Sequence, residues 1–133
     1  MGCGKAHIFK YFAAKSDPRF HFVNYDHVTK GDNVISQDIS QTPLDDASAE
    51  IVVMSLAMWG SNCHSYVREA YRILETGGQL YMAEATKRWS QKDDRDIVIS
   101  GSEGGLLRRL LEDTGFQVLS ATIKKFSFFI CSK

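Results

Sequence analysis

The amino-acid sequence predicts an α/β fold, with a mostly parallel twisted sheet, helices on both faces and a C-terminal antiparallel hairpin. Helix-like and strand-like segments alternate along the chain. The run Glu50–Leu56 is almost continuously apolar, which is typical of a parallel-sheet strand that is covered on both faces. Two further strand-like runs flank Lys124-Lys125 near the end of the chain, and this pattern indicates the hairpin.

The first part of the chain is expected to hold one helix and three strands. Residues Ala6–Ala14 read as a helix, because Ile8, Phe9 and Phe12 fall on one side of it. Aromatic and β-branched residues then favour strands, which we place at Phe20–Tyr25, Asn33–Gln37 and Glu50–Leu56.

The second helix is expected to begin after Asn62, whose side chain can cap it. Its buried face follows the i, i+3, i+4, i+7 spacing at Val67, Ala70, Tyr71 and Leu74. We expect Gly77-Gly78 to end this helix, because glycine accepts the left-handed conformation common just past a helix end. The strand Gln79–Ala85 follows.

The last part of the chain is expected to hold a polar loop, a helix and the hairpin. Residues Thr86–Gly101 are polar and rich in both charges, so we expect a loop. Ser102 can cap the helix that follows, and Gly115 can end it. Its apolar stripe consists of Leu106, Leu107, Leu110 and Leu111. The hairpin strands are Phe116–Ile123 and Phe126–Cys131.

Composition favours a single domain, here residues 1–133. The 133 residues carry 16 basic and 16 acidic side chains, and this balance argues against an overall basic nucleic-acid binder, although a local patch stays possible. The three cysteines form no C-x-x-C pair, which suits a reducing, intracellular compartment. The longest apolar stretch, Ile51–Trp59, is too short to cross a membrane. The four histidines show no metal-ligand spacing, so no metal is expected.

A glycine turn and two acids suggest a cofactor that contains adenosine. Gly2-Cys3-Gly4 precedes a helix, and a G-x-G turn lets the backbone approach a ligand closely. Asp26 follows a strand about 20 residues later, where a carboxylate can accept from both ribose hydroxyls. Asp38 and Ile39 follow the next strand, where they can bind an adenine. A simple tight turn and a solvated loop acid are the alternatives.

The order of these segments resembles the class I S-adenosylmethionine-dependent methyltransferases, which have a Rossmann-like fold. It is most similar to the ribosomal-RNA-processing protein 8 (nucleomethylin) family. The segments that carry the resemblance are Gly2-Cys3-Gly4, Tyr25-Asp26, Gln37-Asp38-Ile39, Thr42-Pro43-Leu44-Asp45-Asp46, the run from Ser55 to Asn62, the run from Glu69 to Leu74, Gly77-Gly78, the run from Tyr81 to Ala85, and Thr114-Gly115-Phe116.

The resemblance implies a cofactor, a substrate and a set of site residues. Gly2 and Gly4 would lie against the methionine part of S-adenosyl-L-methionine, which leaves as S-adenosyl-L-homocysteine. Asp26 would hold the ribose, and Ser55 would line the pocket. Asp38 and Ile39 would bind the adenine. The family methylates N1 of an adenine in large-subunit ribosomal RNA, which implies a role in rRNA processing and ribosome biogenesis and a place in the nucleus and nucleolus.

The sequence does not assign a catalytic residue, and the two candidates are Trp59 and Glu84. Trp59 could stack a flipped base, or it could be a core or interface residue. Glu84 could stabilise charge on a methylated ring nitrogen, or it could be a structural cap on the loop that follows it. The segment Lys87–Arg95 interleaves basic and aromatic residues and could contact phosphates, but neighbouring acids favour a solvated loop.

The resemblance also predicts a strand before Gly2, so we expect a methyltransferase domain that is N-terminally incomplete. In that fold the strand lies between the one ending at Asp26 and the one holding Ile51–Leu56. Two alternatives stay open: a small-molecule methyltransferase of the same fold, and a non-catalytic module that binds S-adenosylmethionine in a nucleolar complex. The sequence does not indicate an oligomeric state.

Overall fold

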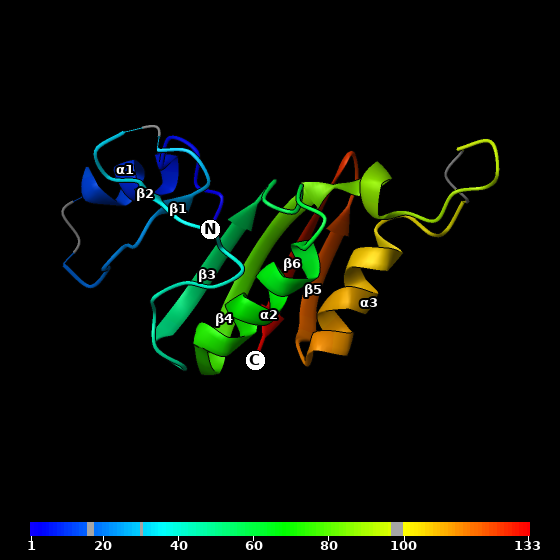
Figure 1. The fold of residues 1–133 in the computed structure, drawn as a ribbon. Helices are drawn as coiled ribbons and strands as arrows, with labels where there is room; N and C mark the ends of the chain where they lie inside the picture. Colours follow the sequence, from blue (N-terminus) through cyan, green and yellow to red (C-terminus); the bar gives the residue numbers. More distant parts are fainter. Residues whose placement is uncertain (16–17, 30, 97–99) are drawn as a thin grey trace.

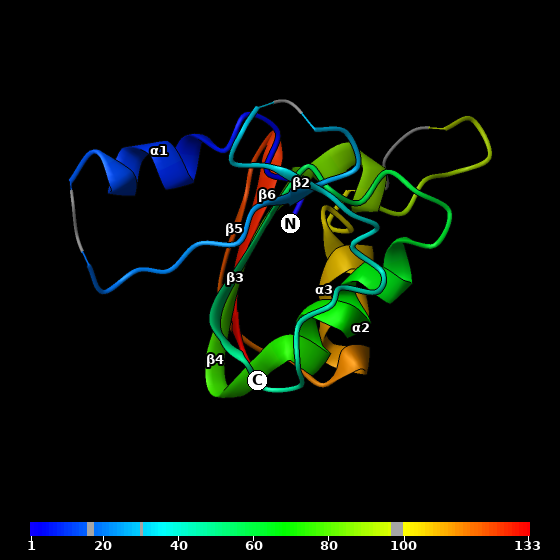
Figure 2. The same ribbon diagram turned by 60° about the vertical axis from the view of Figure 1, so that its left-hand side comes forward.

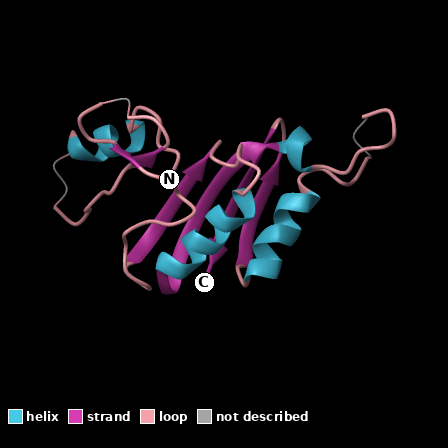
Figure 3. Cartoon of the chain, in the orientation of Figure 1, coloured by secondary structure: helices cyan, strands magenta, loops and turns pink. Residues whose placement is uncertain are grey.

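A four-stranded sheet with two helices on one face forms the main body of the molecule (Figures 1 and 3). The computed structural model describes residues 1–15, 18–29, 31–96 and 100–133. Its elements in chain order are α1 (His7–Ala13), β1 (Tyr25–Asp26), β2 (Ile35–Ser36), β3 (Ala49–Ser55), α2 (Cys63–Ile73), β4 (Leu74–Ala85), the 3-10 helix η1 (Thr86–Trp89), α3 (Gly105–Thr114), β5 (Gln117–Ile123) and β6 (Phe126–Ser132).

The sheet has the order β3-β4-β6-β5 and is mixed. Strands β3 and β4 are parallel, with Val52 opposite Leu80 and Ser55 opposite Ala83. Strand β6 is antiparallel to both β4 and β5, so the predicted C-terminal hairpin is confirmed. Because β3 and β4 run in the same direction, the loops after both strands, including η1, emerge at one edge of the sheet.

The core lies between this sheet and the helices α2 and α3. The side chains in it with at most 1% of their surface exposed include Met54, Val67, Leu80, Leu107, Leu111 and Phe129. Each such side chain contributes roughly 1.5–3 kcal/mol by leaving water. The apolar spacing expected for both helices is therefore confirmed at its centre, although Leu106 at the edge of the α3 stripe is 37% exposed.

The opposite face of the sheet is open in the described part of the chain. Ile51 on β3 and Phe128 on β6 are both 49% exposed. The expectation that β3 is covered on both faces is therefore wrong here. Figure 2 shows α1 on this side of the sheet, but α1 extends away from it and buries none of its own residues. Its aromatic rings instead pack against those of the segment before β1, as in the pair Phe12 and Phe20.

Strands β1 and β2 form a separate two-stranded parallel sheet. Both strands are shorter than expected, because only Tyr25–Asp26 and Ile35–Ser36 pair. Within the described residues, no ladder joins β1 to β3. The backbone of the first residues bridges them instead: the nitrogen of Met1 donates to the carbonyl of Val53 at 2.8 Å, and that of Cys3 donates to the carbonyl of Tyr25 at 3.1 Å.

Helix α2 begins directly after Asn62, as expected, but three other features of the helix ends need correction. Asn62 precedes α2 but makes no side-chain cap, because its oxygen accepts a hydrogen bond from the Tyr66 hydroxyl. The N-cap of α3 is Gly104, so Ser102 lies before the helix rather than capping it. Gly77-Gly78 does not end α2, which already stops at Ile73. Both glycines lie within β4, where a Cβ on Gly78 would meet the carbonyl of Glu75 at 2.9 Å.

Candidate functional site

The glycine turn, β1 and β3 meet at one edge of the molecule. The N–H of Gly4 donates to the carboxylate of Asp26 at 2.7 Å, which ties the turn to the end of β1. The turn also touches the loop after β3, since a Cβ on Gly2 would lie 2.6 Å from that of Ala57. Figure 1 shows the N-terminus between β1 and β3. Residues that are far apart in the sequence thus come together here, as the strand-end pattern predicts.

The backbone conformation favours glycine at both Gly2 and Gly4, and at Gly2 the lack of space does so as well. Both have positive φ, 64° for Gly2 and 55° for Gly4, a conformation that residues with a side chain rarely adopt. At Gly2 a side chain would also collide with Ala57. At Gly4 nothing lies within 4 Å of an added Cβ, so the space beside this backbone is open. The turn therefore offers an accessible stretch of main chain, as a cofactor-binding turn requires.

Asp26 is the last residue of β1, and Asp38 lies two residues after the parallel strand β2. Asp26 also accepts from the N–H of Val28 at 3.2 Å, so two backbone groups fix its carboxylate. Asp38 is exposed and accepts from the N–H of Ser40 at 2.9 Å. This hydrogen bond holds the pKa of Asp38 below its usual value. Ile39 beside it is buried. Both carboxylates are therefore at least partly open to solvent, and each is oriented by a backbone N–H.

Ser55 ends β3 and is exposed at the same edge. The next residue, Leu56, has φ 51°, so the chain turns sharply immediately after the strand. Glu84 on β4 lies beneath this turn, and its Oε1 accepts from the N–H of Ala57 at 2.7 Å and from that of Met58 at 3.1 Å. Burial raises the pKa of Glu84. Glu84 thus holds the loop after β3, whereas the structural interpretation from the sequence was a cap on the loop that follows Glu84 itself.

Trp59 is exposed and does not belong to the core of the described chain. Its side chain is 65% exposed, and the guanidinium carbon of Arg88 lies 4.8 Å from the centre of its ring. In the neighbouring segment Lys87–Arg95, several of the basic and aromatic side chains already have partners within the protein. Trp89 is buried, and Lys92 and Arg95 form ion pairs with acids of the same segment, Asp96 and Asp93.

One network, between the last turns of α2 and the loop before β3, was not expected from the sequence. The carboxylate of Glu69 accepts from the N–H and hydroxyl of Thr42, at 2.6 and 2.7 Å, and from Arg72. Arg72 also donates to the carbonyl of Leu44 at 2.7 Å. The network fixes the Thr42–Asp46 loop on α2. The i, i+3 spacing of Glu69 and Arg72 was the available signal, but the loop partner lies 27 residues away.

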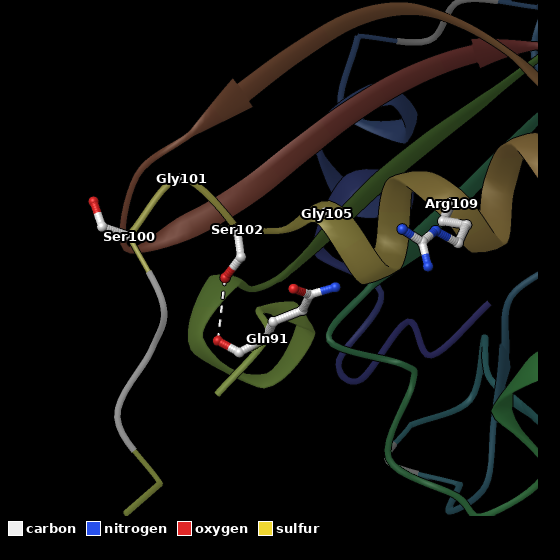
Figure 4. A pocket seen from close by; sticks show the side chains of 6 residues that line it. All are labelled: Gln91, Ser100, Gly101, Ser102, Gly105 and Arg109. Carbon is white, nitrogen blue, oxygen red and sulfur yellow. Dashed lines mark hydrogen bonds between the residues drawn. The ribbon is translucent and has the colours of Figure 1, made fainter. Parts of the chain in front are cut away.

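A cavity of about 320 Å³ lies elsewhere, between the segment after η1 and the start of α3 (Figure 4). Gln91 and Arg109 line it, and the hydroxyl of Ser102 donates to the carbonyl of Gln91 at 3.1 Å. None of the residues expected at the cofactor site lines this cavity. It therefore adds nothing to the site at the strand ends.

The described part of the chain contains no group of three or more His, Cys, Asp or Glu residues that could hold a metal ion. In the same residues, no helix is long and apolar enough to cross a membrane.

Comparison with known proteins places these features in a family. A family model described as "Hypothetical methyltransferase" matches residues 1–132. The 25S rRNA (adenine(645)-N(1))-methyltransferase of Schizosaccharomyces pombe is 32% identical over 128 residues, which cover 96% of this chain and 36% of that protein. Ribosomal RNA-processing protein 8 of Caenorhabditis elegans is 39% identical over 89 residues, which cover 67% of this chain and 25% of that protein. The match thus spans well under half of either relative.

Solved structures agree on the fold. The S-adenosylmethionine dependent methyltransferase from Mesorhizobium loti matches with a TM-score of 0.70 at 11% identity, over 99% of this chain and 88% of that one. A likeness at this identity shows the fold, so the expected Rossmann-like methyltransferase fold is confirmed. Within the described residues, however, the larger sheet is mixed rather than mostly parallel, and its helices cover one face rather than both.

Proposed function

The chain belongs to the family whose model is described as a hypothetical methyltransferase, and from this membership we propose that it uses S-adenosylmethionine to methylate N1 of an adenine in large-subunit ribosomal RNA. The observation that carries the proposal is the meeting of Gly2, Gly4 and Asp26 beside the end of β3. The names of the S. pombe and C. elegans relatives support the RNA substrate and, with it, a nucleolar place of action.

The residues present fit an adenosine-containing cofactor. Gly4 leaves its backbone uncovered on one side, and Asp38 has a charged, exposed carboxylate. Asp26 retains acceptor capacity besides its two backbone partners, since a carboxylate has about four lone-pair sites. Gly2 and Gly4 would hold the methionine part, Asp26 the ribose, and Asp38 with Ile39 the adenine. Ser55 would line the pocket beside them.

The cofactor supplies, when bound, a methyl group on a positively charged sulfur. The task left to this chain is to position the acceptor and to keep water out, and positioning alone can supply much of the rate. A nucleophilic residue is not needed for that task. The loop from Leu56 to Trp59 is held from below by Glu84 and stands at the end of β3, where an acceptor base would approach. An adenine must be unpaired before its N1 can be reached.

Two measurements test the proposal. Calorimetry of the chain with S-adenosylhomocysteine tests the cofactor site, and we expect saturable binding. Incubation of the protein with labelled S-adenosylmethionine and unmodified large-subunit rRNA, followed by nucleoside mass spectrometry, tests the acceptor. We expect label in 1-methyladenosine. Label in a small molecule, or binding without transfer to either acceptor, would replace the RNA assignment with one of the two alternatives.

A further inference from the structure

The loop after β3 exposes an indole although its backbone is closely held. Trp59 is 65% exposed, while Met58 next to it is fully buried. Glu84 fixes two N–H groups of this loop. Gly60 on the other side is closely packed, since a Cβ there would meet the Tyr66 hydroxyl at 2.5 Å. A closely held loop thus presents a large apolar ring to solvent.

Arg88 adds a positive charge to this ring. Its guanidinium carbon stands 4.8 Å from the ring centre, within the range of a cation–π contact. Arg88 comes from η1, directly after β4, whereas Trp59 follows β3. Because β3 and β4 are parallel neighbours, the segments that follow them place the Trp59 ring and the Arg88 guanidinium side by side. The nearby acid, Glu84, is only 1% exposed and offers little negative charge to a ligand.

This pair borders the turn that we assign to the cofactor. Ala57, two residues before Trp59, is the residue that a Cβ on Gly2 would strike. The backbone of Ala57 also donates to Glu84 on β4, the strand that leads into η1 and Arg88. A group lying on Trp59 would therefore be close to the methionine end of the proposed site.

We propose that Trp59 and Arg88 form a platform that binds an unpaired RNA nucleotide. The role of this platform in methyl transfer rests on the proposed function. A base stacks on the indole plane, and the guanidinium contacts the adjoining phosphate. Stacking on an aromatic side chain beside a cation is the usual way in which proteins bind single-stranded nucleic acid. The platform binds the nucleotide and positions it at the end of β3.

Trp59 itself can report the binding. The chain has two tryptophans, and Trp89→Phe leaves Trp59 as the sole indole. Titration of this variant with a short single-stranded oligoadenylate should quench the indole emission to saturation, whereas a blunt RNA duplex should not. The platform is overturned if the single strand leaves the emission unchanged. It is also overturned if the emission depends on protein concentration without RNA, because Trp59 would then be a protein contact.

Substitutions in the otherwise native chain separate stacking from charge. We expect Trp59→Leu to weaken oligoadenylate binding roughly tenfold or more, and Trp59→Phe to weaken it less, because phenylalanine keeps an aromatic face. Tyr81→Ala, which removes another exposed aromatic on the open face of the sheet, is the matched control and should change nothing. Equal losses in Trp59→Leu and Tyr81→Ala would contradict a stacking site.

The salt dependence of binding tests Arg88. Arg88→Gln should lower the slope of log affinity against log salt by roughly 0.7, the value for one phosphate contact on a single strand. Arg68→Gln on the exposed surface of α2 should leave the slope as it is. S-adenosylhomocysteine binding is measured on every variant. If the chain binds the cofactor but the substitutions at Trp59 and Arg88 leave RNA binding unchanged, the platform alone is refuted. If the chain binds RNA through these residues but does not bind the cofactor, the proposed function is refuted and the platform is not.

Discussion

Single side chains at the strand ends of this molecule hold backbone in place before they hold any ligand. Asp26 receives the N–H groups of Gly4 and Val28, and Glu84 receives those of Ala57 and Met58. The two carboxylates thereby fix the two segments that face each other across the candidate site. Substitutions at these positions should therefore affect binding and folding to different degrees.

Asp26→Ala should weaken the binding of S-adenosylhomocysteine by about 1–3 kcal/mol, since it removes an acceptor from the proposed ribose site and releases Gly4. Asp38→Ala should weaken it by a similar or smaller amount, because Asp38 is exposed and does not hold the glycine turn. Calorimetry measures both, with Asp113→Ala on the exposed side of α3 as the control. Unchanged affinity in both Asp26→Ala and Asp38→Ala would refute the cofactor assignment.

Glu84→Leu should destabilise the fold by about 2–4 kcal/mol, because it leaves two backbone N–H groups without their acceptor. Glu84→Gln keeps an acceptor oxygen in the same place, so its loss should be clearly smaller. Urea unfolding at neutral pH measures the free energy of unfolding of both variants. If the two variants lose the same amount, the role of Glu84 depends on its charge and not on the loop.

At the scale of helices and strands, local pattern predicted which elements form but not what they pack against. The spacing of Val67 and Ala70 places α2 correctly, because a helix face repeats within a few residues. The same reasoning placed Ile8 on the apolar side of α1, yet Ile8 is 47% exposed, since no described helix or strand covers it. The start of α2 after Asn62 was also placed correctly, whereas its end was not, because the chain enters β4 at Leu74, before the two glycines.

The candidate site was likewise only partly predictable from the sequence. The order of Gly2, Gly4, Asp26 and Asp38 could be derived from the sequence, because each follows or precedes a predicted strand. The contact between Glu84 and Ala57 could not, since 27 residues separate them and neither belongs to a local motif. The pairing of Arg88 with Trp59 depends on the same register of β3 and β4, so it too required the structure.

The Glu69 network gives α2 a pH-dependent contribution to stability. Hydrogen bonds from Arg72, and then from Thr42, lower the pKa of Glu69 from 4.5 to about 2. The unfolded chain therefore binds a proton on Glu69 more readily than the folded chain does. The contribution is complete above about pH 4.5 and is lost as the pH falls toward about 2.

Glu69→Gln should therefore destabilise the fold by on the order of 1–3 kcal/mol at pH 7. The difference from the unsubstituted chain should shrink as the pH falls below about 4. Urea unfolding at several pH values measures the difference. Glu112→Gln breaks a surface pair with Arg108 on α3 and serves as the control, with little effect expected at any pH. A constant difference across the range would contradict the assigned role of Glu69.

At the scale of the whole molecule, the two sheets face each other through edges that carry few hydrogen bonds. Among the described residues, β1 pairs only with β2, and β3 pairs only with β4. Between them, the backbone nitrogens of Met1 and Cys3 bond to Val53 and Tyr25. We propose that the chain is a single methyltransferase domain in which a further strand, running into Met1, belongs between β1 and β3.

This proposal predicts that stability and cofactor binding rise together. A strand in that position would pair with the open edge of β3 and would fix the turn at Gly2, whose neighbours already lie against both sheets. A short extension of alternating valine and threonine ahead of Met1 should therefore raise the melting temperature by about 3 °C or more. It should also tighten the binding of S-adenosylhomocysteine, because less of the turn must be ordered on binding.

An extension of the same length made of glycine and serine is the matched control, since it has the length but little tendency to form a strand. Thermal unfolding followed by circular dichroism and calorimetry of the two extended chains provide the comparison. If both extensions behave alike, the gap between β1 and β3 does not accept a strand, and the two sheets are stabilised without one.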